Sequence, residues 1–286
     1  MICAEIVQQH YENFPVASIL LPKHLRKPIS AIYSFARTAD DLADEGELDA
    51  SDRLEALEKY ETLFNDMLAG KYHDDPVFIA LADSISNFEL TPELFTDLLS
   101  AFNQDITKTR YRDFDEVLDY CSRSANPVGR LLLQLVKKDQ PHARKLSDSV
   151  CTALQLINFY QDIGQDFDEN NRIYLAEDEM AASGINEDHL AKRISDVKFK
   201  AFMNQQTIRA ANMLSSGYPL CRHIGGRLGL ELKMTIHAAH TVATRMLREK
   251  DCFRRPRLSK TDWPMVLFKS LFDISPTTLN GLTYTI

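Results

Sequence analysis

The chain has 286 residues, a formal net charge of −8 and only ten glycines. This length can bury a large core and nothing in the composition divides it, so we expect one domain over residues 1–286. The charge argues against a nucleic-acid partner, because the 33 Lys and Arg residues are scattered rather than clustered. Five widely spaced cysteines without a C-x-x-C pair predict reduced thiols in a cytoplasmic protein, and no apolar run is long enough to predict a membrane span.

Apolar residues recur at helical spacing along nearly the whole chain, and strand patterns are absent. Prolines and glycines divide the predicted helices, beginning with Pro22 and Pro28. The longest predicted helices, in chain order, cover residues 29–44, 114–136, 143–167, 191–214 and 227–250. The third is apolar around much of its circumference, which favours a place at the centre of a bundle. The sequence therefore predicts an all-α fold, a single-domain helical bundle with a central cavity.

Two pairs of aspartates stand out in this helical pattern. The segment RTADDLADE places Asp40 and Asp44 four residues apart, and the segment QDIGQD repeats this spacing with Asp162 and Asp166. Each pair therefore shares one helix face. A solvated acidic surface is the alternative interpretation, and it stays open for the first pair. It is weaker for the second pair, which follows apolar turns where buried carboxylates without counter-charges would be costly.

The chemistry that suits two carboxylate pairs is Mg²⁺ binding, with Mn²⁺ as a substitute. Mg²⁺ takes oxygen ligands and is usually held by one or two carboxylates together with substrate phosphates. Such a site could bind a diphosphate, and the metal would act as a Lewis acid when the C–O bond breaks. The carbocation left behind would need an apolar, aromatic-lined pocket. The aromatic residues within a turn or two of the aspartates are Tyr33, Phe35, Phe159 and Tyr160.

Residues 31–45 resemble the first aspartate-rich motif of the squalene/phytoene synthase family, and residues 155–166 resemble the second. The segment RIYL at 172–175 follows as that family's R-x-Y-L signature does. The resemblance runs in order and spacing from residue 10 to residue 272, and leaves 273–286 as an unassigned tail. It implies a fold of the isoprenoid synthase type and a Mg²⁺-dependent enzyme that acts on a prenyl diphosphate.

Finer features resemble one branch, the bacterial hydroxysqualene synthases of hopanoid biosynthesis. They are HYENFPV at 10–16, YC at 120–121 with SANPVGR at 124–130, RPRL at 255–258 leading to DWP at 262–264, and Gln161 where other branches commonly have Arg. The implied reaction converts presqualene diphosphate and water to hydroxysqualene and diphosphate, a step toward squalene and hopanoids, without NADPH. Two departures concern the segment at 168–171, which lacks the family's common Gly, and Ala176, which stands where Pro often follows Tyr-Leu.

The resemblance also implies roles for individual residues. The implied metal ligands are Asp40, Asp44, Asp162 and Asp166. The implied catalytic residues are Tyr33, Arg37, Asn158, Gln161 and Tyr174. The implied substrate contacts are Phe14, Arg37, Gln155, Asn158, Phe159 and Arg172. We hypothesise in addition that the amide of Gln161 places the attacking water, because an amide can donate or accept a hydrogen bond whereas an arginine can only donate.

Two other functions stay open at this point. One is the head-to-head condensation of two prenyl diphosphates to squalene, dehydrosqualene or phytoene. The other is a non-catalytic assembly factor on the same fold, which the presence of all four aspartates counts against. The sequence leaves the oligomeric state open.

Two further segments have simpler explanations. His237 and His240 share one helix side but lack a third ligand, so we expect structural histidines rather than a metal site. Residues 263–272 form an amphipathic segment, for which core packing is the commoner explanation and contact with a bilayer the alternative. Such contact would place the protein peripherally at the inner face of the membrane, where long hydrocarbons partition.

Overall fold

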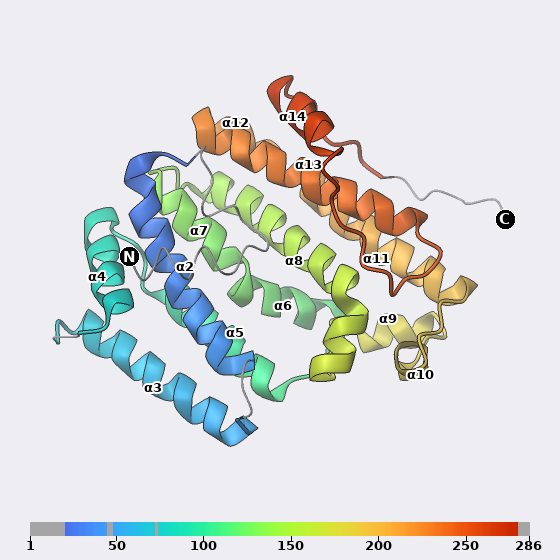
Figure 1. Ribbon diagram of the computed structural model, residues 1–286, viewed down its shortest axis with the longest axis horizontal. Helices are drawn as coiled ribbons and strands as arrows, with labels where there is room; N and C mark the ends of the chain where they lie inside the picture. The colour runs from blue at the N-terminus through green and yellow to red at the C-terminus, as the bar shows by residue number, and fades with distance from the viewer. Residues whose placement is uncertain (1–20, 45–47, 72–73, 280–286) are drawn as a thin grey trace.

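The structure is a computed structural model that describes residues 21–44, 48–71 and 74–279. Within these ranges the chain forms helices and no β-strand, apart from one isolated bridge between Tyr111 and Ala176. The helices are α2 (Lys23–Asp44), α3 (Ala50–Leu68), α4 (Pro76–Phe88), α5 (Glu93–Thr107), α6 (Phe114–Ser124), α7 (Asn126–Leu135), α8 (Pro141–Asn170), α9 (Glu177–Ala182), α10 (Glu187–Ala191), α11 (Val197–Ser216), α12 (Leu220–Ile224), α13 (Gly226–Arg248) and α14 (Trp263–Leu271) (Figure 1). The predicted all-α bundle is confirmed.

The predicted helix at 114–136 is wrong in one respect, because α6 and α7 are separate helices that meet at Ala125. Pro127 stands in the first turn of α7, where a helix does not need the N–H that proline lacks. The helix predicted at 191–214 begins later than expected, because α10 ends at Ala191 and residues 192–196 are not helical. Asp196 caps a new helix by accepting a hydrogen bond from the Phe199 amide at 2.8 Å, so α11 begins after it.

Pro28, which we expected to separate two predicted helices, lies inside α2. The helix begins five residues earlier, at Lys23, and Pro28 is buried among the neighbouring helices. Proline is best tolerated near the N-terminal end of a helix, because few backbone hydrogen bonds are lost there. Tertiary packing therefore extends α2 beyond the limit that the local sequence predicted.

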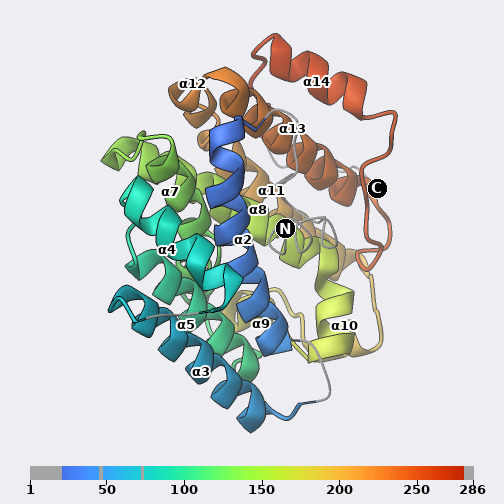
Figure 2. The ribbon, with the colours of Figure 1, turned by 60° about the vertical axis from the view of Figure 1, so that its left-hand side comes forward.

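Two hydrophobic cores divide the bundle, one around α2 to α5 and the other around α8, α11 and α13 (Figures 1 and 2). Phe35 of α2 is fully buried in the first core. Four aromatic rings have centroids between 5.2 and 6.2 Å from its own, and they belong to Tyr60, Phe64, Phe78 and Phe95. This contact fixes the rotation of α2, so that the opposite face, which carries Tyr33 and Asp40, turns toward the middle of the molecule.

The second core is built on α8, a helix of 30 residues between α7 and α11 (Figure 1). Two glycines allow the neighbours to approach it closely. A Cβ atom at Gly129 of α7 would lie 2.3 Å from the Ser147 Oγ, and one at Gly217 would lie 2.8 Å from the Leu146 carbonyl oxygen. The absence of these side chains lets α8 run through the centre, as the sequence predicted.

The described helices include none that is both long and apolar enough to cross a bilayer. For the segment 263–272, core packing was the favoured explanation, and it is wrong. Val266 is the one large apolar side chain of α14 that is buried, because the helix contacts α13 through a narrow face formed by Val266 and Ser270. The remaining apolar side chains of α14 are exposed.

Candidate active site

An apolar cavity with an empty volume of about 1020 Å³ lies between α2, α7, α8, α12 and α13. On α2 its wall includes Ile29, Tyr33 and Ala36. Asp40 and Asp44 continue the same helix face over the next two turns, because residues three or four apart lie above one another. The lining of the cavity therefore leads into the first aspartate pair.

The same arrangement occurs on the opposite wall, which α8 forms. Ser147 and Cys151 line the cavity, and the steps of three and four residues then lead through Gln155 and Asn158 to Asp162. Gln155 and Asn158 are half-buried on this face. Both predicted aspartate pairs thus stand at the same end of an apolar cavity, on the two helices that form its opposite walls.

Arg172 connects the two pairs. Its guanidinium donates to both carboxylate oxygens of Asp44, at 2.6 and 3.2 Å, and its backbone N–H donates to the Asp166 carbonyl oxygen at 3.0 Å. The guanidinium also donates twice to the carbonyl oxygen of Asp105, at 2.8 and 3.1 Å. A bidentate pair of this kind, in which Arg172 is buried and Asp44 is half-buried, fixes the orientation of both groups. Arg172 therefore lies at the aspartate end, where a diphosphate contact is expected.

Asn171 allows the chain to turn at the end of α8, so that Arg172 can reach Asp44. It ends α8 in the left-handed conformation, with φ of 51°. Glycine is the usual residue there, and asparagine is the side chain that best replaces it. The absence of the family's common Gly between residues 168 and 171 is therefore compensated, and Arg172 still turns back toward α2.

Two more arginines contact the aspartates. Arg37 pairs with Asp40 at 3.0 Å and with Asp41 at 2.6 Å, and so neutralises part of the first cluster. Arg255 donates to Asp162 at 2.7 Å from the loop after α13. The sequence had shown Arg255 only as part of the RPRL motif and had assigned it no role. Because these partners are 93 residues apart, the sequence gave no local signal for the pair.

The end of the cavity carries more negative charge than these arginines neutralise. Burial and the neighbouring charge of Asp44 raise the pKa of Asp40 to about 7, although Arg37 acts in the opposite direction. Burial and the charge of Asp162 likewise raise the pKa of Asp166 to about 7. Buried carboxylates with raised pKa values are stabilised by an added cation.

Aromatic rings stack beside the aspartate end. The ring of Tyr174 lies parallel to that of Phe159, with a centroid distance of 3.7 Å and an interplanar angle of 5°. The hydroxyls of Tyr174 and Tyr120 both donate to the buried carboxylate of Asp105, at 3.3 and 2.6 Å. Asp105 therefore holds both tyrosines as well as Arg172. Sequence reasoning missed Asp105, because a single aspartate in a helical segment has no distinguishing pattern.

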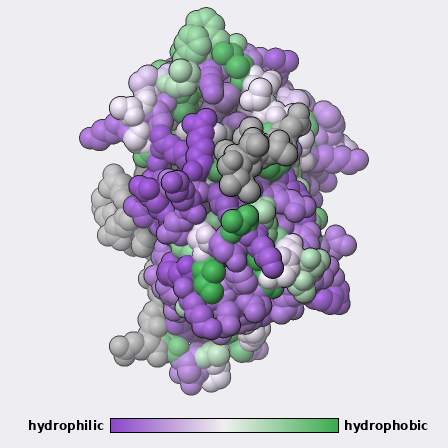
Figure 3. All heavy atoms as spheres, turned by 90° about the vertical axis from the view of Figure 1, so that its right-hand side faces the viewer, coloured by the Kyte–Doolittle hydropathy of each residue, from purple (hydrophilic) through white to green (hydrophobic). Residues whose placement is uncertain are grey.

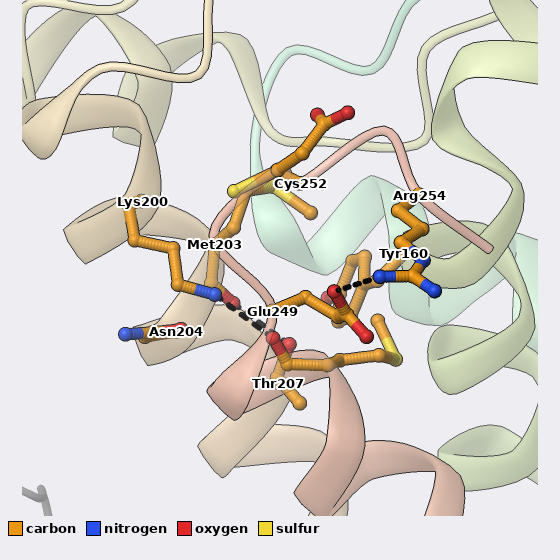
Figure 4. A pocket seen from close by; sticks show the side chains of 10 residues that line it. Tyr160, Lys200, Met203, Asn204, Thr207, Glu249, Cys252 and Arg254 are labelled. Atoms are coloured by element: carbon orange, nitrogen blue, oxygen red, sulfur yellow. Dashed lines mark hydrogen bonds and ion pairs between the residues drawn. The ribbon is translucent and has the colours of Figure 1, made fainter. Parts of the chain in front are cut away.

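Two aromatic residues that we expected beside the aspartates face elsewhere. Phe35 is the centre of the first core, and Tyr160 turns to the far side of α8. There Tyr160 lines a second, smaller pocket of about 270 Å³ with Lys200 and Glu249 (Figure 4). Tyr33, in contrast, lines the large cavity as predicted. Phe14 and the motif at 10–16 lie outside the described residues.

Gln161 stands at the start of the second pair and contacts the loop that carries Arg255. Its Nε2 donates to the Pro256 carbonyl oxygen at 2.6 Å. The loop is thereby held over α8 by two contacts from adjacent positions, one from Gln161 and one from Asp162. An arginine in place of Gln161 would add a positive charge next to Arg255.

The aspartates fit Mg²⁺ by the chemistry of their donor atoms. Within the part of the chain that the structure describes, no three acidic, histidine or cysteine side chains are grouped closely enough to bind a metal unaided. Such a cage is not required, since Mg²⁺ usually takes one or two carboxylates and completes its shell with water and phosphate oxygens. The oxygen ligands, and the burial and neighbouring carboxylates that raise the pKa values of Asp40 and Asp166, therefore suit Mg²⁺ that arrives with a diphosphate.

Comparison with known proteins gives one consistent result. The sequence profile of the squalene/phytoene synthase family matches residues 7–263. A hydroxysqualene synthase of Rhodopseudomonas palustris is 39% identical over 84% of this chain and 80% of its own length. A hydroxysqualene synthase of Zymomonas mobilis is 33% identical over 88% of this chain and 84% of its own. The crystal structure of squalene synthase HpnC from Alicyclobacillus acidocaldarius superposes with a TM-score of 0.80 at 32% identity and covers 87% of this chain and 93% of that one.

The fold and the cavity define the class, a helical enzyme of the isoprenoid synthase fold. The chain belongs to the squalene/phytoene synthase family. The resemblance that the two aspartate motifs predicted is thereby confirmed. The roles of the individual site residues stay predictions.

Proposed function

We propose that this protein converts presqualene diphosphate and water to hydroxysqualene and diphosphate. The observation that carries the proposal is the continuity between the apolar cavity and the two aspartate pairs along α2 and α8. A substrate with a long hydrocarbon chain and a diphosphate group changes in the same way along its length, from apolar at one end to charged at the other. The relatives named hydroxysqualene synthase support this choice within the family.

The diphosphate would bind at the aspartate end. Asp40, Asp44, Asp162 and Asp166 would hold Mg²⁺ there, and Mn²⁺ can replace it. Mg²⁺ would supply Lewis-acid stabilisation of the departing diphosphate. Arg172 and Arg37, which pair with aspartates in this structure, would exchange part of these contacts for phosphate oxygens.

The C–O bond to the diphosphate breaks, and a carbocation remains in the cavity. Tyr33, which lines the cavity, would stabilise it by cation–π attraction. The stacked rings of Phe159 and Tyr174, which are buried behind the cavity lining, would help to exclude water. Gln155 and Asn158, half-buried between the cavity and Asp162, would contact the substrate where hydrocarbon and diphosphate meet. One water then forms the new C–O bond and loses a proton, so the reaction needs no reduced nicotinamide.

Gln161 is our candidate for the placement of that water. Its Nε2 is engaged with the Pro256 carbonyl, which orients the amide so that the Oε1 can accept a hydrogen bond from water. Replacement by arginine, as in Gln161→Arg, should lower the alcohol yield more than substrate binding. An unchanged yield would remove Gln161 from the mechanism.

A cytoplasmic location fits the cysteines. In the described part of the chain Cys121, Cys151, Cys221 and Cys252 form no disulfide. Reduced thiols of this kind are typical of a reducing compartment. The substrate and product are hydrocarbons that partition into lipid, so we propose that the protein works at the inner face of the membrane.

The test is metal-dependent diphosphate release from presqualene diphosphate. EDTA should abolish release, and each of Asp40→Asn, Asp44→Asn, Asp162→Asn and Asp166→Asn should reduce it strongly with helical content unchanged. Asp83→Asn on the exposed side of α4 is the matched control and should stay active. Full release in EDTA, or full activity of all four variants, would contradict the proposed site.

A further inference from the structure

Exposed hydrophobic side chains are concentrated on α14 and the residues that follow it. Of the 13 large hydrophobic residues exposed in the described chain, seven lie between positions 263 and 274. The most exposed of the seven are Phe272 at 67% and Leu271 at 61%. Figure 3 shows hydrophobic side chains gathered at the upper end of one face, at the height of α14 in Figure 1. A concentration of this kind marks a binding surface rather than ordinary surface variation.

The shape of this surface is convex. α14 lies at the outer edge of the molecule and rests on α13 (Figures 1 and 2). Its buried residues are Val266 and Ser270, which face inward. On the outer side the rings of Phe268 and Phe272 lie against each other, with centroids 4.6 Å apart and an interplanar angle of 40°. A projecting helix with aromatic residues on its outer face suits insertion into a soft apolar layer.

The charge around α14 differs from that of the whole protein. Residues 252–274 contain five basic and two acidic residues, in a chain with a net charge of −8. Two of the five basic residues are paired within the protein, Arg254 with Glu249 at 3.3 Å and Arg255 with Asp162 at 2.7 Å. Both acidic side chains are neutralised, since Asp262 pairs with Arg245 at 2.5 Å and Asp273 pairs with Arg222 at 2.6 Å. Arg257 and Lys260 are exposed just before the helix. The segment therefore presents basic and aromatic side chains together, the combination that binds anionic lipid surfaces.

The position of α14 relates it to the cavity. Asp273, just after the helix, also pairs with Lys233 of α13 at 2.7 Å and so fixes this end of α14 beside α12 and α13. Leu220 and Ile224 of α12 line the cavity. The exposed hydrophobic surface thus lies beside the apolar end of the cavity, away from the aspartates.

We propose that α14 docks the protein on a lipid bilayer that contains anionic lipids, with its outer aromatic face among the acyl chains. This inference is drawn from the exposed hydrophobic surface, its charge and its place beside the cavity. A role for docking in the exchange of substrate and product hydrocarbons between bilayer and cavity rests on the proposed function. Docking itself is a property of the surface and can be tested without turnover.

Trp263 provides a direct reporter, because it is the single tryptophan of the chain and begins α14. The full-length protein is mixed with vesicles of phosphatidylcholine that contain about 30% phosphatidylglycerol, an anionic lipid that gives the vesicles a negative surface. Trp263 emission should shift to shorter wavelength, lipids brominated on their acyl chains should quench it, and the protein should float with the vesicles. An emission spectrum unchanged by vesicles, with the protein left in the unbound fraction, would overturn the proposal.

Substitutions distinguish this helix from other exposed hydrophobic residues. The double variant Phe268→Ser and Phe272→Ser should weaken vesicle binding by about tenfold or more. Val197→Ser with Ile79→Ser, two exposed sites on other helices, is the matched control and should bind as the unaltered protein does. Equal loss of binding in both pairs would contradict a specific role for α14.

The other candidate occupant of this surface is a second copy of the chain. Sedimentation of the protein without lipid tests this alternative. If the protein forms a dimer that the same phenylalanine substitutions dissociate, and if it does not bind vesicles, the occupant is a second copy of the chain and the bilayer proposal is overturned. Diphosphate release in detergent micelles separates the two proposals. The α14 variants should keep diphosphate release in micelles. If the unaltered protein is inactive in micelles but still binds vesicles, the proposed function is contradicted and the docking proposal stands.

Discussion

The buried carboxyl group of Asp105 should make the stability of the protein depend on pH. Asp105 is 7% exposed, and its carboxyl accepts hydrogen bonds from Tyr120 and Tyr174. Burial raises the pKa of Asp105 to about 6 from the ordinary value of 3.8, although Arg172 acts against the shift. A group whose folded pKa is raised favours the folded state most when it is protonated. The contribution of Asp105 to stability is therefore complete below pH 4 and is lost as the pH rises through 6.

The size of this effect follows from the shift. A difference of about two pKa units corresponds to roughly 3 kcal/mol of unfolding free energy, since each unit is worth about 1.36 kcal/mol. Asp105→Asn cannot ionise, and its amide keeps an acceptor for the tyrosine hydroxyls. Relative to the unaltered protein, this variant should gain stability by up to about 3 kcal/mol between pH 4 and pH 7.5.

The assay is urea unfolding of both proteins without metal, followed by circular dichroism at steps from pH 4 to pH 7.5. The difference between the two free energies isolates Asp105, because other titrating carboxylates are common to both. Asp83→Asn, exposed on α4, is the control and should give a difference that does not change with pH. A flat difference for Asp105→Asn as well would refute the reasoning about burial.

Three other predictions follow from the packing. Phe35→Ala removes the centre of the aromatic core and should lower the unfolding free energy by about 3–5 kcal/mol in urea titration, and a loss below about 1 kcal/mol would contradict that role. Gly229→Ala would place a Cβ atom 2.5 Å from the Cys221 carbonyl oxygen, so we expect a loss of about 1–3 kcal/mol, and a stable variant would show that α12 can move. Burial raises the pKa of Cys121 to about 12, so mass spectrometry after alkylation at pH 8 should find it unlabelled in the native protein and labelled in urea, whereas rapid native labelling would place it at the surface.

Local sequence predicted those parts of the site that repeat within a helix. The spacing of Asp162 and Asp166 shows a shared helix face directly, and the apolar turns before them predicted the central place of α8. Contacts between distant segments left no such trace. Arg255 reaches Asp162 from a loop 93 residues later, and Asp105 meets Arg172 across 67 residues.

Side-chain direction was the second limit. Phe35 and Tyr160 are near the aspartates in sequence, but each is rotated onto another face of its helix and packs elsewhere. The same reasoning applies to α14. Its pattern predicts an amphipathic helix, but only the tertiary contacts decide that the apolar face is left exposed.

The origin of the product oxygen tests the central claim most directly. Presqualene diphosphate and Mg²⁺ are supplied to the purified protein in ¹⁸O-labelled water without any nicotinamide, and the products are extracted and analysed by mass spectrometry. We predict a C30 alcohol that carries the label, formed together with diphosphate. Release of diphosphate only after a reduced nicotinamide is added, with unoxygenated squalene as the product, would contradict the account and favour a squalene synthase.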